Sequence, residues 1–424
     1  MARAARLPGA PESDDRVVCH VDMDCFYAAC ERLREPALRN EPVVVGMGFE
    51  PGETIGAVAT ASYEAREYGV ESAQAISEAL ERLPRKIDAA ENPALDVDDA
   101  GFYRPVDMAY YESVAADVKE ILRERAAVLR EVSIDEAYLD VTDRVDWADD
   151  GPREFARELK ETIEAEVGVT ASVGVAPSMS AAKIASDHDK PDGLVVIRPG
   201  EVRAFLAPLD VEAVHGIGPV TAAELRDLGI ETAGDLAGAD PERIEDRFGE
   251  RGLAVHQYAR GEDDRDVEPV GKPKSLSRES SFAEATADEA RKRERVRGLA
   301  TAVAERAARK DALYRTIGIK VVLPPYDVNT RAKSLPGPVE DGELVEEVAL
   351  ELLEEFEGDR ARKLGVRVSN LSFGAEEQVS LESWDEGPTE SASEEGQTDA
   401  SDATGEATSH VRRGQLSLGD FEES

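Results

Sequence analysis

Three features are scarce or missing in this sequence, and each absence argues against a class of protein. Cysteine is rare, with only 3 among 424 residues. Cys19, Cys25 and Cys30 are odd in number and lack Cys-x-x-Cys spacing, which argues against a disulfide framework and a zinc site. No stretch approaches the roughly 18 apolar residues that a membrane span needs. We therefore expect a cytoplasmic protein that has no membrane partner.

Positive charge is also scarce. The 50 Lys and Arg stand against 90 Asp and Glu, a formal net charge of −40. Such repulsion ordinarily disfavours compaction and binding to a polyanion. In multimolar salt, however, the Debye length falls to about 3 Å, and an acidic surface keeps a protein soluble. The composition therefore indicates an extreme halophile, in which nucleic-acid binding would depend on local charge. Residues 272–320 provide it, with 13 Lys or Arg against 7 Asp or Glu.

The length and the 41% hydrophobic content are enough for two to four compact units. Apolar and polar patterns predict helices and strands in alternation, hence an α+β or split βαβ sheet. The predicted helices cover 25–33, 62–68, 107–128 and 154–167, and the predicted strands cover 16–24, 42–45, 56–60, 132–141 and 170–175. Short helical patterns follow residue 199, and an α+β pattern returns at 272.

Two strands have carboxylates where a core strand would not. Residues 16–24 alternate, so that Val17, Cys19, Val21 and Met23 share one face, and Asp22 and Asp24 share the other. Near residue 135 the apolar positions are 132 and 134, then 137, 139 and 141. This phase change predicts a turn or bulge that directs Asp135 and Glu136 to one side.

Asp22, Asp135 and Glu136 can therefore converge on two divalent cations about 3.5 to 4 Å apart, the arrangement used for in-line phosphoryl transfer. Hard oxygen ligands favour magnesium. One ion would activate a primer 3′-hydroxyl, and the other would hold a triphosphate and stabilise the leaving pyrophosphate. Asp24 lies where the N-cap of the next helix is expected, and we predict capping as its main role.

Several ordered motifs resemble the signatures of Y-family DNA polymerases of the DinB branch. They are Val-Asp-Met-Asp-Cys-Phe-Tyr (21–27), Ala-Val-Ala-Thr-Ala-Ser-Tyr-Glu-Ala-Arg (57–66), Ser-Ile-Asp-Glu-Ala-Tyr-Leu-Asp (133–140), Ser-Val-Gly-Val-Ala (172–176), Ala-Lys-Ile-Ala-Ser-Asp (182–187) and Lys-Pro-Asp-Gly (190–193). The resemblance runs from about Arg16 to Phe373. It implies a monomer that copies damaged templates from primer-template DNA and dNTPs, with Asp22, Asp135, Glu136 and the Met23 carbonyl as metal ligands.

The resemblance also implies a right-hand polymerase with a ferredoxin-like palm and a helix-hairpin-helix thumb. The implied division is palm 16–33 and 96–195, fingers 34–95, thumb 196–265, little finger 272–373, acidic linker 374–411 and clamp-binding peptide 412–424. The linker is expected to be disordered, because residues 376–410 contain 11 acidic residues and no Lys or Arg.

The nucleotide pocket is expected next to the metal strand. In the family, the position of Tyr27 is a steric gate, where an aromatic ring leaves no room for a 2′-hydroxyl. Its neighbour Phe26 is expected in the core. Thr60, Tyr63 and Arg66 recur at i, i+3 and i+6, which predicts one face at the start of a helix, suited to a triphosphate. Lys190 can add a point charge.

One departure concerns the fingers. Family members usually have Met-Pro where this chain has Gln74-Ala75. A proline fixes the backbone angle φ, so its absence puts in question the roof over the templating base and the lesion preference.

The DNA contacts are predicted from one turn and a group of basic residues. Residues 214–225 resemble a helix-hairpin-helix, in which the turn Gly216 to Gly218 and the next amides form a nest for phosphate. In the little finger, basic residues alternate with apolar ones on predicted strands. The expected DNA contacts there are Lys274, Arg278, Arg315, Lys320, Arg331 and Arg367.

The C-terminus contains a hydrophobic cluster after a long acidic stretch. Leu418 and Phe421 are three residues apart, so a single helical turn places them on one side, with Gln415 able to hydrogen-bond. This resembles the motif that binds PCNA-type sliding clamps. Glu422 stands where a second aromatic is common, which should weaken the contact.

Two other functions are compatible with parts of the pattern. A nucleotide cyclase also has a palm-like sheet with paired carboxylates, but it explains neither the hairpin motif nor the steric gate. A non-catalytic DNA or clamp adaptor would be expected to have a damaged carboxylate set, and this set is intact.

Overall fold

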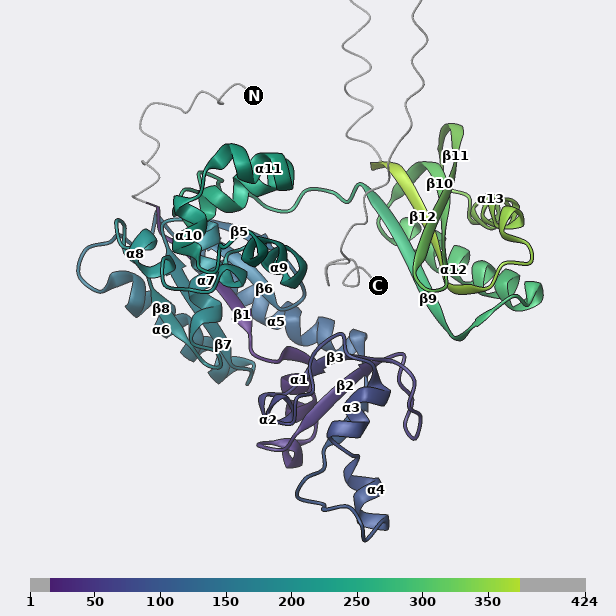
Figure 1. Ribbon diagram of the computed structural model, residues 1–424, viewed down its shortest axis with the longest axis horizontal. Helices are drawn as coiled ribbons and strands as arrows, with labels where there is room; N and C mark the ends of the chain where they lie inside the picture. Colours follow the sequence, from purple (N-terminus) through teal and green to yellow (C-terminus); the bar gives the residue numbers. More distant parts are fainter. Residues whose placement is uncertain (1–15, 374–424) are drawn as a thin grey trace, which may run out of the picture. The chain divides into compact units, whose positions relative to one another are not determined.

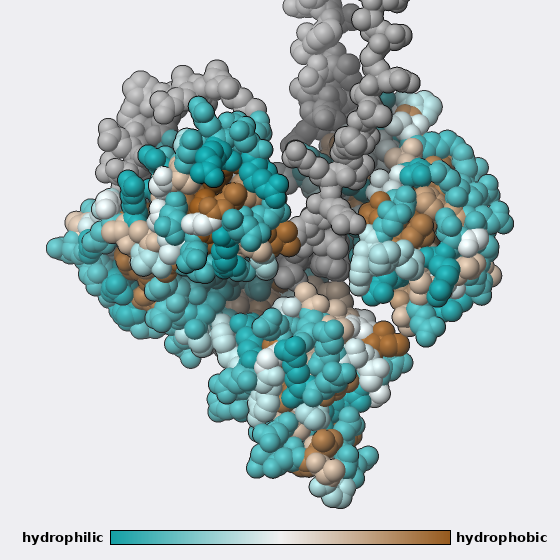
Figure 2. All heavy atoms as spheres, viewed as in Figure 1, coloured by the Kyte–Doolittle hydropathy of each residue, from teal (hydrophilic) through white to brown (hydrophobic). Residues whose placement is uncertain are grey.

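The fold is described here from a computed structural model, in which residues 16–373 are placed. The chain divides between Val270 and Gly271 into two compact units (Figure 1). No helix among the described residues is long and apolar enough to cross a membrane. The face seen in Figure 2 is largely hydrophilic with small hydrophobic patches, as expected for a chain that is 33% charged.

A five-stranded sheet organises the first unit, in the order β5-β6-β1-β7-β8. Its strands are β1 (Val18–Met23), β5 (Val128–Glu131), β6 (Glu136–Asp140), β7 (Ala171–Ala176) and β8 (Leu194–Val196). Central β1 pairs antiparallel with β6 and β7, and β8 runs parallel to β7. The sheet is packed with α5 (Met108–Arg125), α6 (Gly151–Glu166) and α7 (Met179–His188).

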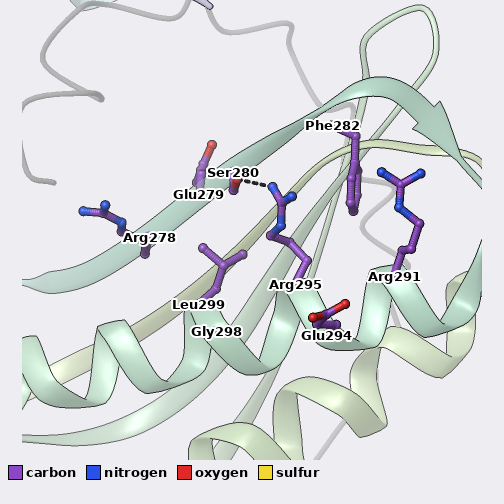
Figure 3. Close-up of a pocket in the computed structure, with 9 residues that line it drawn as sticks. All are labelled: Arg278, Glu279, Ser280, Phe282, Arg291, Glu294, Arg295, Gly298 and Leu299. Atoms are coloured by element: carbon purple, nitrogen blue, oxygen red, sulfur yellow. Dashed lines mark hydrogen bonds between the residues drawn. The ribbon is translucent and has the colours of Figure 1, made fainter. Parts of the chain in front are cut away.

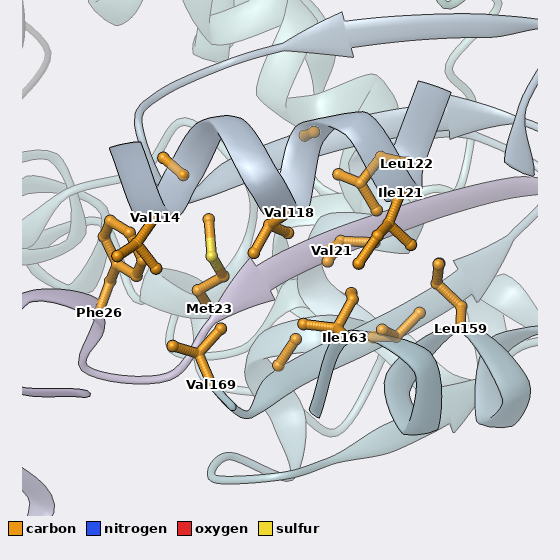
Figure 4. Packing of buried hydrophobic residues seen from close by; sticks show 14 of the residues in the cluster. Val21, Met23, Phe26, Val114, Val118, Ile121, Leu122, Leu159, Ile163 and Val169 are labelled. Carbon is orange, nitrogen blue, oxygen red and sulfur yellow. The ribbon is translucent and has the colours of Figure 1, made fainter. Parts of the chain in front are cut away.

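The predicted alternation of β1 is confirmed, although both faces are buried. Val21 and Met23 pack against α5 and α6, where Figure 4 shows them beside Val118 and Ile163. Val18 belongs to a second core with α7 and the following helices. The face of β1 that contains Asp22 is therefore directed toward α7.

Gly174 permits α7 to lie close to the sheet. A Cβ atom at this position would stand 2.1 Å from the Ala182 carbonyl oxygen and 2.3 Å from the Ser186 nitrogen. Both atoms belong to the helix backbone, which cannot move aside as a flexible side chain could. The absence of a side chain at Gly174 therefore places the residues of α7 against β1.

A smaller sheet, β3-β2-β4, lies between residues 43 and 105. Its elements are α1 (Phe26–Arg34), which leads into it, η2 (Pro36–Leu38), β2 (Val43–Met47), β3 (Ala57–Ala61), α2 (Tyr63–Glu67), α3 (Ile76–Arg82), α4 (Lys86–Glu91) and β4 (Phe102–Pro105). Ser62 caps α2, because its hydroxyl accepts a hydrogen bond from the Ala65 amide. Ala75 precedes α3 with φ −65° and ψ 140°, the φ that a proline would fix.

Short helices complete the first unit: α8 (Val202–Leu206), η3 (Val211–Ala213), α9 (Pro219–Asp227), α10 (Ala233–Gly238) and α11 (Pro241–Ala259). They share the core that contains Val18 and α7. Between η3 and α9, Gly216 has φ +90°, a left-handed conformation that favours glycine. The predicted turn between helices is thus present at this position.

The second unit is a four-stranded sheet in the order β11-β10-β12-β9 with two helices packed on it. Its elements are β9 (Ser275–Thr286), α12 (Glu289–Arg309), β10 (Ala312–Leu323), β11 (Asp327–Val339), α13 (Gly342–Leu353), η4 (Glu354–Phe356) and β12 (Ala361–Phe373). Ile317, Ile319 and Val366 belong to its core. The opposite strand face contains Ser277, Lys320 and Arg367 and is called the open face below.

The α+β fold class predicted from the sequence is confirmed. The expected acidic linker, 374–411, and the expected clamp-binding peptide, 412–424, lie outside the described residues.

Candidate active site

Asp22 and Glu136 are direct cross-strand partners on β1 and β6. The Nζ atom of Lys183, on α7, lies 2.9 Å from Asp22 Oδ2 and 2.7 Å from Glu136 Oε1. Lys190 Nζ lies 2.6 Å from the same Asp22 oxygen. Two carboxylates from different strands thus converge on one point, where two ammonium groups compensate their charge.

Asp135 is held beside this pair by the turn that the phase change predicted. The Ser133 hydroxyl donates to Asp135 Oδ1 at 2.5 Å and accepts from the Glu136 amide at 2.9 Å. The Met23 amide donates to the Asp135 carbonyl oxygen at 3.0 Å. The hairpin therefore brings the backbone of Met23 next to Asp135, and all four residues of the predicted ligand set come together.

Burial makes these carboxylates sensitive to neighbouring charge. Burial raises the pKa of Asp22 to about 7, Glu136 adds to this rise, and Lys183 and Lys190 oppose it. Burial alone would raise the pKa of Glu136, but the His20 imidazole and the Lys183 ammonium outweigh it and lower that pKa. Burial also raises the pKa of Asp135. A group of this kind is stabilised by nearby cations.

The donor set suits a divalent cation, because three carboxylates and a backbone carbonyl supply hard oxygen ligands. As the side chains of residues 16–373 stand, no three His, Cys, Asp or Glu are grouped closely enough to hold a metal ion. The Lys183 ammonium lies between Asp22 and Glu136 and acts there as the cation. The oxygen ligands of these four residues are therefore of the kind that binds a divalent cation, and Lys183 compensates the carboxylate charge in the structure.

The N-cap prediction for Asp24 is wrong. The N-cap residue of α1 is Cys25, in a left-handed conformation with no capping hydrogen bond from its side chain. Asp24 instead accepts hydrogen bonds from the Ser172 hydroxyl at 2.8 Å, the Asp192 amide at 2.8 Å and the Tyr63 hydroxyl at 3.2 Å. It therefore connects the end of β1 to β7, to α2 and to the loop that contains Lys190.

Tyr27 is the second residue of α1, and its ring is 8% exposed. It stacks on Tyr111 of α5, with ring centroids 4.7 Å apart and planes at 15°. The Tyr111 hydroxyl donates to Glu31 Oε1 at 2.7 Å, which fixes the supporting ring. Phe26 is 1% exposed and lies in the core as expected.

Thr60, Tyr63 and Arg66 do not share one helix face, contrary to the prediction. Thr60 lies in β3, because the strand continues to Ala61 and the helix begins only at Tyr63. The Arg66 guanidinium lies 4.6 Å from the centre of the Tyr63 ring. Tyr63 is linked to the loop after Lys190, since Asp24 binds both the Tyr63 hydroxyl and the Asp192 amide.

The basic residues predicted to contact DNA lie on both faces of the sheet in the second unit. Lys320 and Arg367 are on the open face, where Lys320 forms an ion pair with Glu279 at 2.9 Å. Arg278 and Arg331 pair with the core residues Val366 and Ile319, so they lie on the helix side. Strand alternation explains this difference, because neighbouring residues face opposite ways.

Of the remaining predicted contacts, Lys274, Arg315 and Gly216 are exposed and Gly218 is half-buried. Lys274 directly precedes β9, and Arg315 is exposed next to an irregularity in the pairing of β10. In the first unit, the Gly216 carbonyl accepts a hydrogen bond from Arg251 at 3.0 Å, and Gly218 is the N-cap residue of α9.

Two residues of the site were missed from the sequence. Lys183 was part of a recognised motif without a role, and His20 was treated as a strand residue. His20 Nδ1 lies 2.8 Å from the Ser186 hydroxyl, and Nε2 lies 3.8 Å from Glu136 Oε2. The spacing of Lys183, Ser186 and Asp187, at i, i+3 and i+4, would have indicated one helix face.

Comparisons with known proteins identify the family of the chain. Residues 21–187 match the impB/mucB/samB family, residues 273–381 match the C-terminal domain of that family, and residues 199–230 match its HHH motif. A protein of Halobacterium salinarum named DNA polymerase IV is 64% identical over 381 residues, 90% of this chain and 91% of its own length. A DNA polymerase IV of Methanoculleus marisnigri is 41% identical, over 87% of this chain and 98% of its own length.

Solved structures give the same assignment. A Y-family DNA polymerase chimera, Dbh-Dpo4(243-245)-Dbh, matches 84% of this chain and 100% of its own length, with a TM-score of 0.73 and 29% identity. An insertion ternary complex of Dbh DNA polymerase covers the same shares, with a TM-score of 0.58 and 28% identity. The chain therefore belongs to the impB/mucB/samB family of Y-family, DinB-type DNA polymerases.

Proposed function

We propose that this protein is a translesion DNA polymerase that adds dNTPs to a primer 3′-hydroxyl with two Mg²⁺ ions held by Asp22, Asp135 and Glu136. The observation that supports it most is the convergence of Asp22 and Glu136 from paired strands, with Asp135 attached through Ser133 and Met23. Two bound magnesium ions would activate the 3′-hydroxyl and stabilise the leaving pyrophosphate.

The side chains around the carboxylates suit a triphosphate. Lys190 is already within 2.6 Å of Asp22, so it can donate to a phosphate oxygen placed next to the metal site. Arg66 is stacked on Tyr63 and its Nε donates to the Ala61 carbonyl at 3.0 Å, so its two terminal nitrogens are the groups that can bind an anion. Thr60, which is in the strand before them, can contribute a hydroxyl.

The stacked Tyr27 ring suits a steric gate. Tyr111 supports one side of it, and the hydrogen bond from Tyr111 to Glu31 limits the movement of that support. A rigid ring beside the sugar of the incoming nucleotide would exclude a 2′-hydroxyl.

As part of this proposal, the chain is divided into the palm, fingers, thumb and little finger that the family resemblance implies. The turn Gly216 to Gly218 would bind the DNA backbone. Lys320 and Arg367, on the open face, would contact duplex phosphates. A PCNA-type clamp would bind Gln415, Leu418 and Phe421, and the protein would act as a cytoplasmic monomer in a halophile.

A primer-extension assay in concentrated KCl tests this function. Wild-type protein, magnesium, dNTPs and a primer-template should give extended primers, and Asp22→Asn should remove extension without loss of DNA binding. Glu164→Gln, an exposed change on α6, is the matched control and should extend normally. Cyclic nucleotide formed without a primer would instead support the cyclase function, and binding without extension by wild type would support an adaptor.

A further inference from the structure

Four arginines near the start of α12 form two pairs with opposite surroundings. Arg293 and Arg297 face carboxylates near α13, with distances of 3.6 Å to Glu354 and 3.2 Å to Glu346. Arg291 and Arg295 are also four residues apart, but they line a cleft beside β9. No ion pair to a carboxylate forms at Arg291 or Arg295 among residues 16–373. The same helix therefore has arginines that are paired with carboxylates and arginines that are not.

The cleft lies between β9 and α12, with a volume of about 420 Å³ (Figure 3). The residues of its lining that matter here are Arg278, Ser280, Phe282, Arg291, Glu294 and Arg295. The only other acidic residue of the lining, Glu279, is bound to Lys320 at 2.9 Å and Lys363 at 2.6 Å. The charge of the cleft is therefore positive, although the chain as a whole has a net charge of −40.

Phe282 orients the guanidinium groups of the cleft. Figure 3 shows its ring between Arg291 and Arg295, with distances to the ring centre of 6.0 Å and 4.8 Å. Arg295 also donates to the Ser280 hydroxyl and the Ser281 carbonyl. A guanidinium stacked on an aromatic ring keeps its N–H edge available for bidentate binding of phosphate. The cleft is thus preorganised for an anion.

We propose that this cleft binds phosphate groups of a single-stranded segment of nucleic acid, the unpaired arm of a primer-template. The inference rests on the proposed polymerase function. Because β9 is an edge strand, Ser277 and Glu279 face the open side while Arg278 faces the cleft. A backbone crossing this edge passes from the open face, where duplex would bind, to the cleft. The arginines of the cleft all come from one strand–helix pair, β9 and α12, so they can contact the backbone of a single strand.

The test compares two double variants of the full-length protein. Arg291→Gln with Arg295→Gln removes the two arginines that α12 contributes to the cleft, neither of which pairs with a carboxylate within residues 16–373. Arg293→Gln with Arg297→Gln removes the same charge from the same helix and serves as the control. Dissociation constants are measured by fluorescence anisotropy for a duplex with a 5′ overhang and for a blunt duplex of the same paired length. The KCl range is one in which circular dichroism shows the fold intact.

We expect the cleft variant to weaken overhang binding about tenfold and to leave blunt-duplex binding unchanged. Its slope of log affinity against log salt should fall by about 0.7 for each lost phosphate contact. Equal weakening of both DNAs, or equal loss in the control, overturns the assignment. A third result also overturns it: the wild type binds inorganic pyrophosphate, and the cleft variant loses this binding but still binds the overhang. The ligand of the cleft is then a free anion. Primer extension by the wild type at saturating DNA is measured in parallel. If the wild type does not extend primers, the proposed polymerase function is wrong; if it extends them and the cleft variant binds the overhang normally, only the proposed cleft site is wrong.

Discussion

The carboxylate site of the first unit and the arginine cleft of the second unit differ in whether their charged side chains are paired with opposite charges. Asp22 and Glu136 are largely buried, and two lysines within 3 Å compensate them. Arg278 and Arg291 are exposed and have no carboxylate partner among the described residues. Buried charge requires compensation to be stable, whereas exposed charge does not. The carboxylates of the first region therefore need cations beside them, here the two lysines, whereas the arginines of the second region remain available for an anionic ligand.

The largest expected effect separates catalysis from binding. Glu136→Gln removes one charge from the carboxylate group and should lower kcat by at least about a thousandfold, since electrostatic and metal-binding groups contribute on this scale. Affinity for primer-template should change little. The Arg291→Gln, Arg295→Gln variant should do the reverse, with weaker overhang binding and normal kcat at saturating DNA. Single-turnover extension and anisotropy measure the two quantities, and a parallel loss of both in either variant would contradict the separation.

The second prediction compares two glycines, one in the five-stranded sheet and one in the four-stranded sheet. At Gly174 an added Cβ would meet backbone atoms of α7 at 2.1 and 2.3 Å, so Gly174→Ala must displace the helix that contains Lys183. At Gly365 the nearest atom is Cγ of the Glu279 side chain, at 2.8 Å. We expect Gly174→Ala to lower the free energy of unfolding by about 3 kcal/mol and Gly365→Ala by about 1 kcal/mol.

Thermal and denaturant unfolding of the full chain in matched KCl measures this difference. A smaller loss for Gly174→Ala than for Gly365→Ala would mean that α7 can move away from β7 without cost. In that case the close packing is not what places Lys183 beside Asp22.

Local periodicity was enough to predict part of the site. The alternation of β1 placed Asp22 opposite the core face, and the phase change predicted the turn at Asp135. The role of Asp24 could not be predicted in this way. Its partners Ser172 and Asp192 are 148 and 168 residues away in the sequence, so only the folded chain brings them together.

Strand length and strand register decided two other outcomes. The prediction that Thr60 lies on a helix face was wrong, because β3 extends to Ala61 and the helix begins only after the Ser62 cap. The phosphate contact of Arg331 stays a prediction, and the register of Arg331 opposite Ile319 turns it toward Glu355, which binds it at 2.7 Å. Strand register depends on the partner strand, and a single sequence does not contain that information.

The third prediction concerns Tyr27. Tyr27→Ala removes the ring that Tyr111 supports, and the opened space should raise ribonucleotide incorporation relative to deoxynucleotide roughly tenfold to a hundredfold. Tyr27→Phe keeps the ring and should retain discrimination. The ratio of kcat/KM for matched ribo- and deoxynucleotides is the measurement. If Tyr27→Ala keeps the wild-type ratio while remaining folded, Tyr27 is a core residue and not a gate.

The smallest expected effect returns to Gln74-Ala75, where related proteins usually have Met-Pro. Ala75 already has φ −65°, is exposed, and its amide has no hydrogen-bond partner among residues 16–373. The neighbouring groups make the contacts instead, with the Ile76 amide bound to Gly56 and the Gln74 carbonyl to Val58. Ala75→Pro therefore removes no interaction and restricts only the unfolded chain, so it should stabilise the protein by about 0.4 to 1 kcal/mol.

Gln74→Met is the matched control for this position, because it restores the other half of the family pair without changing the backbone. It should leave the free energy of unfolding unchanged, since within residues 16–373 the Gln74 side chain makes one hydrogen bond, to the exposed Glu71 amide. Unfolding of both variants in the same salt gives the comparison. Destabilisation by Ala75→Pro would show that the bend before α3 depends on more than φ. If Ala75→Pro stabilises the protein and does not change extension on an undamaged template, the backbone of this segment already has the conformation that a proline would fix. Lesion preference would then depend on the side chains around the segment.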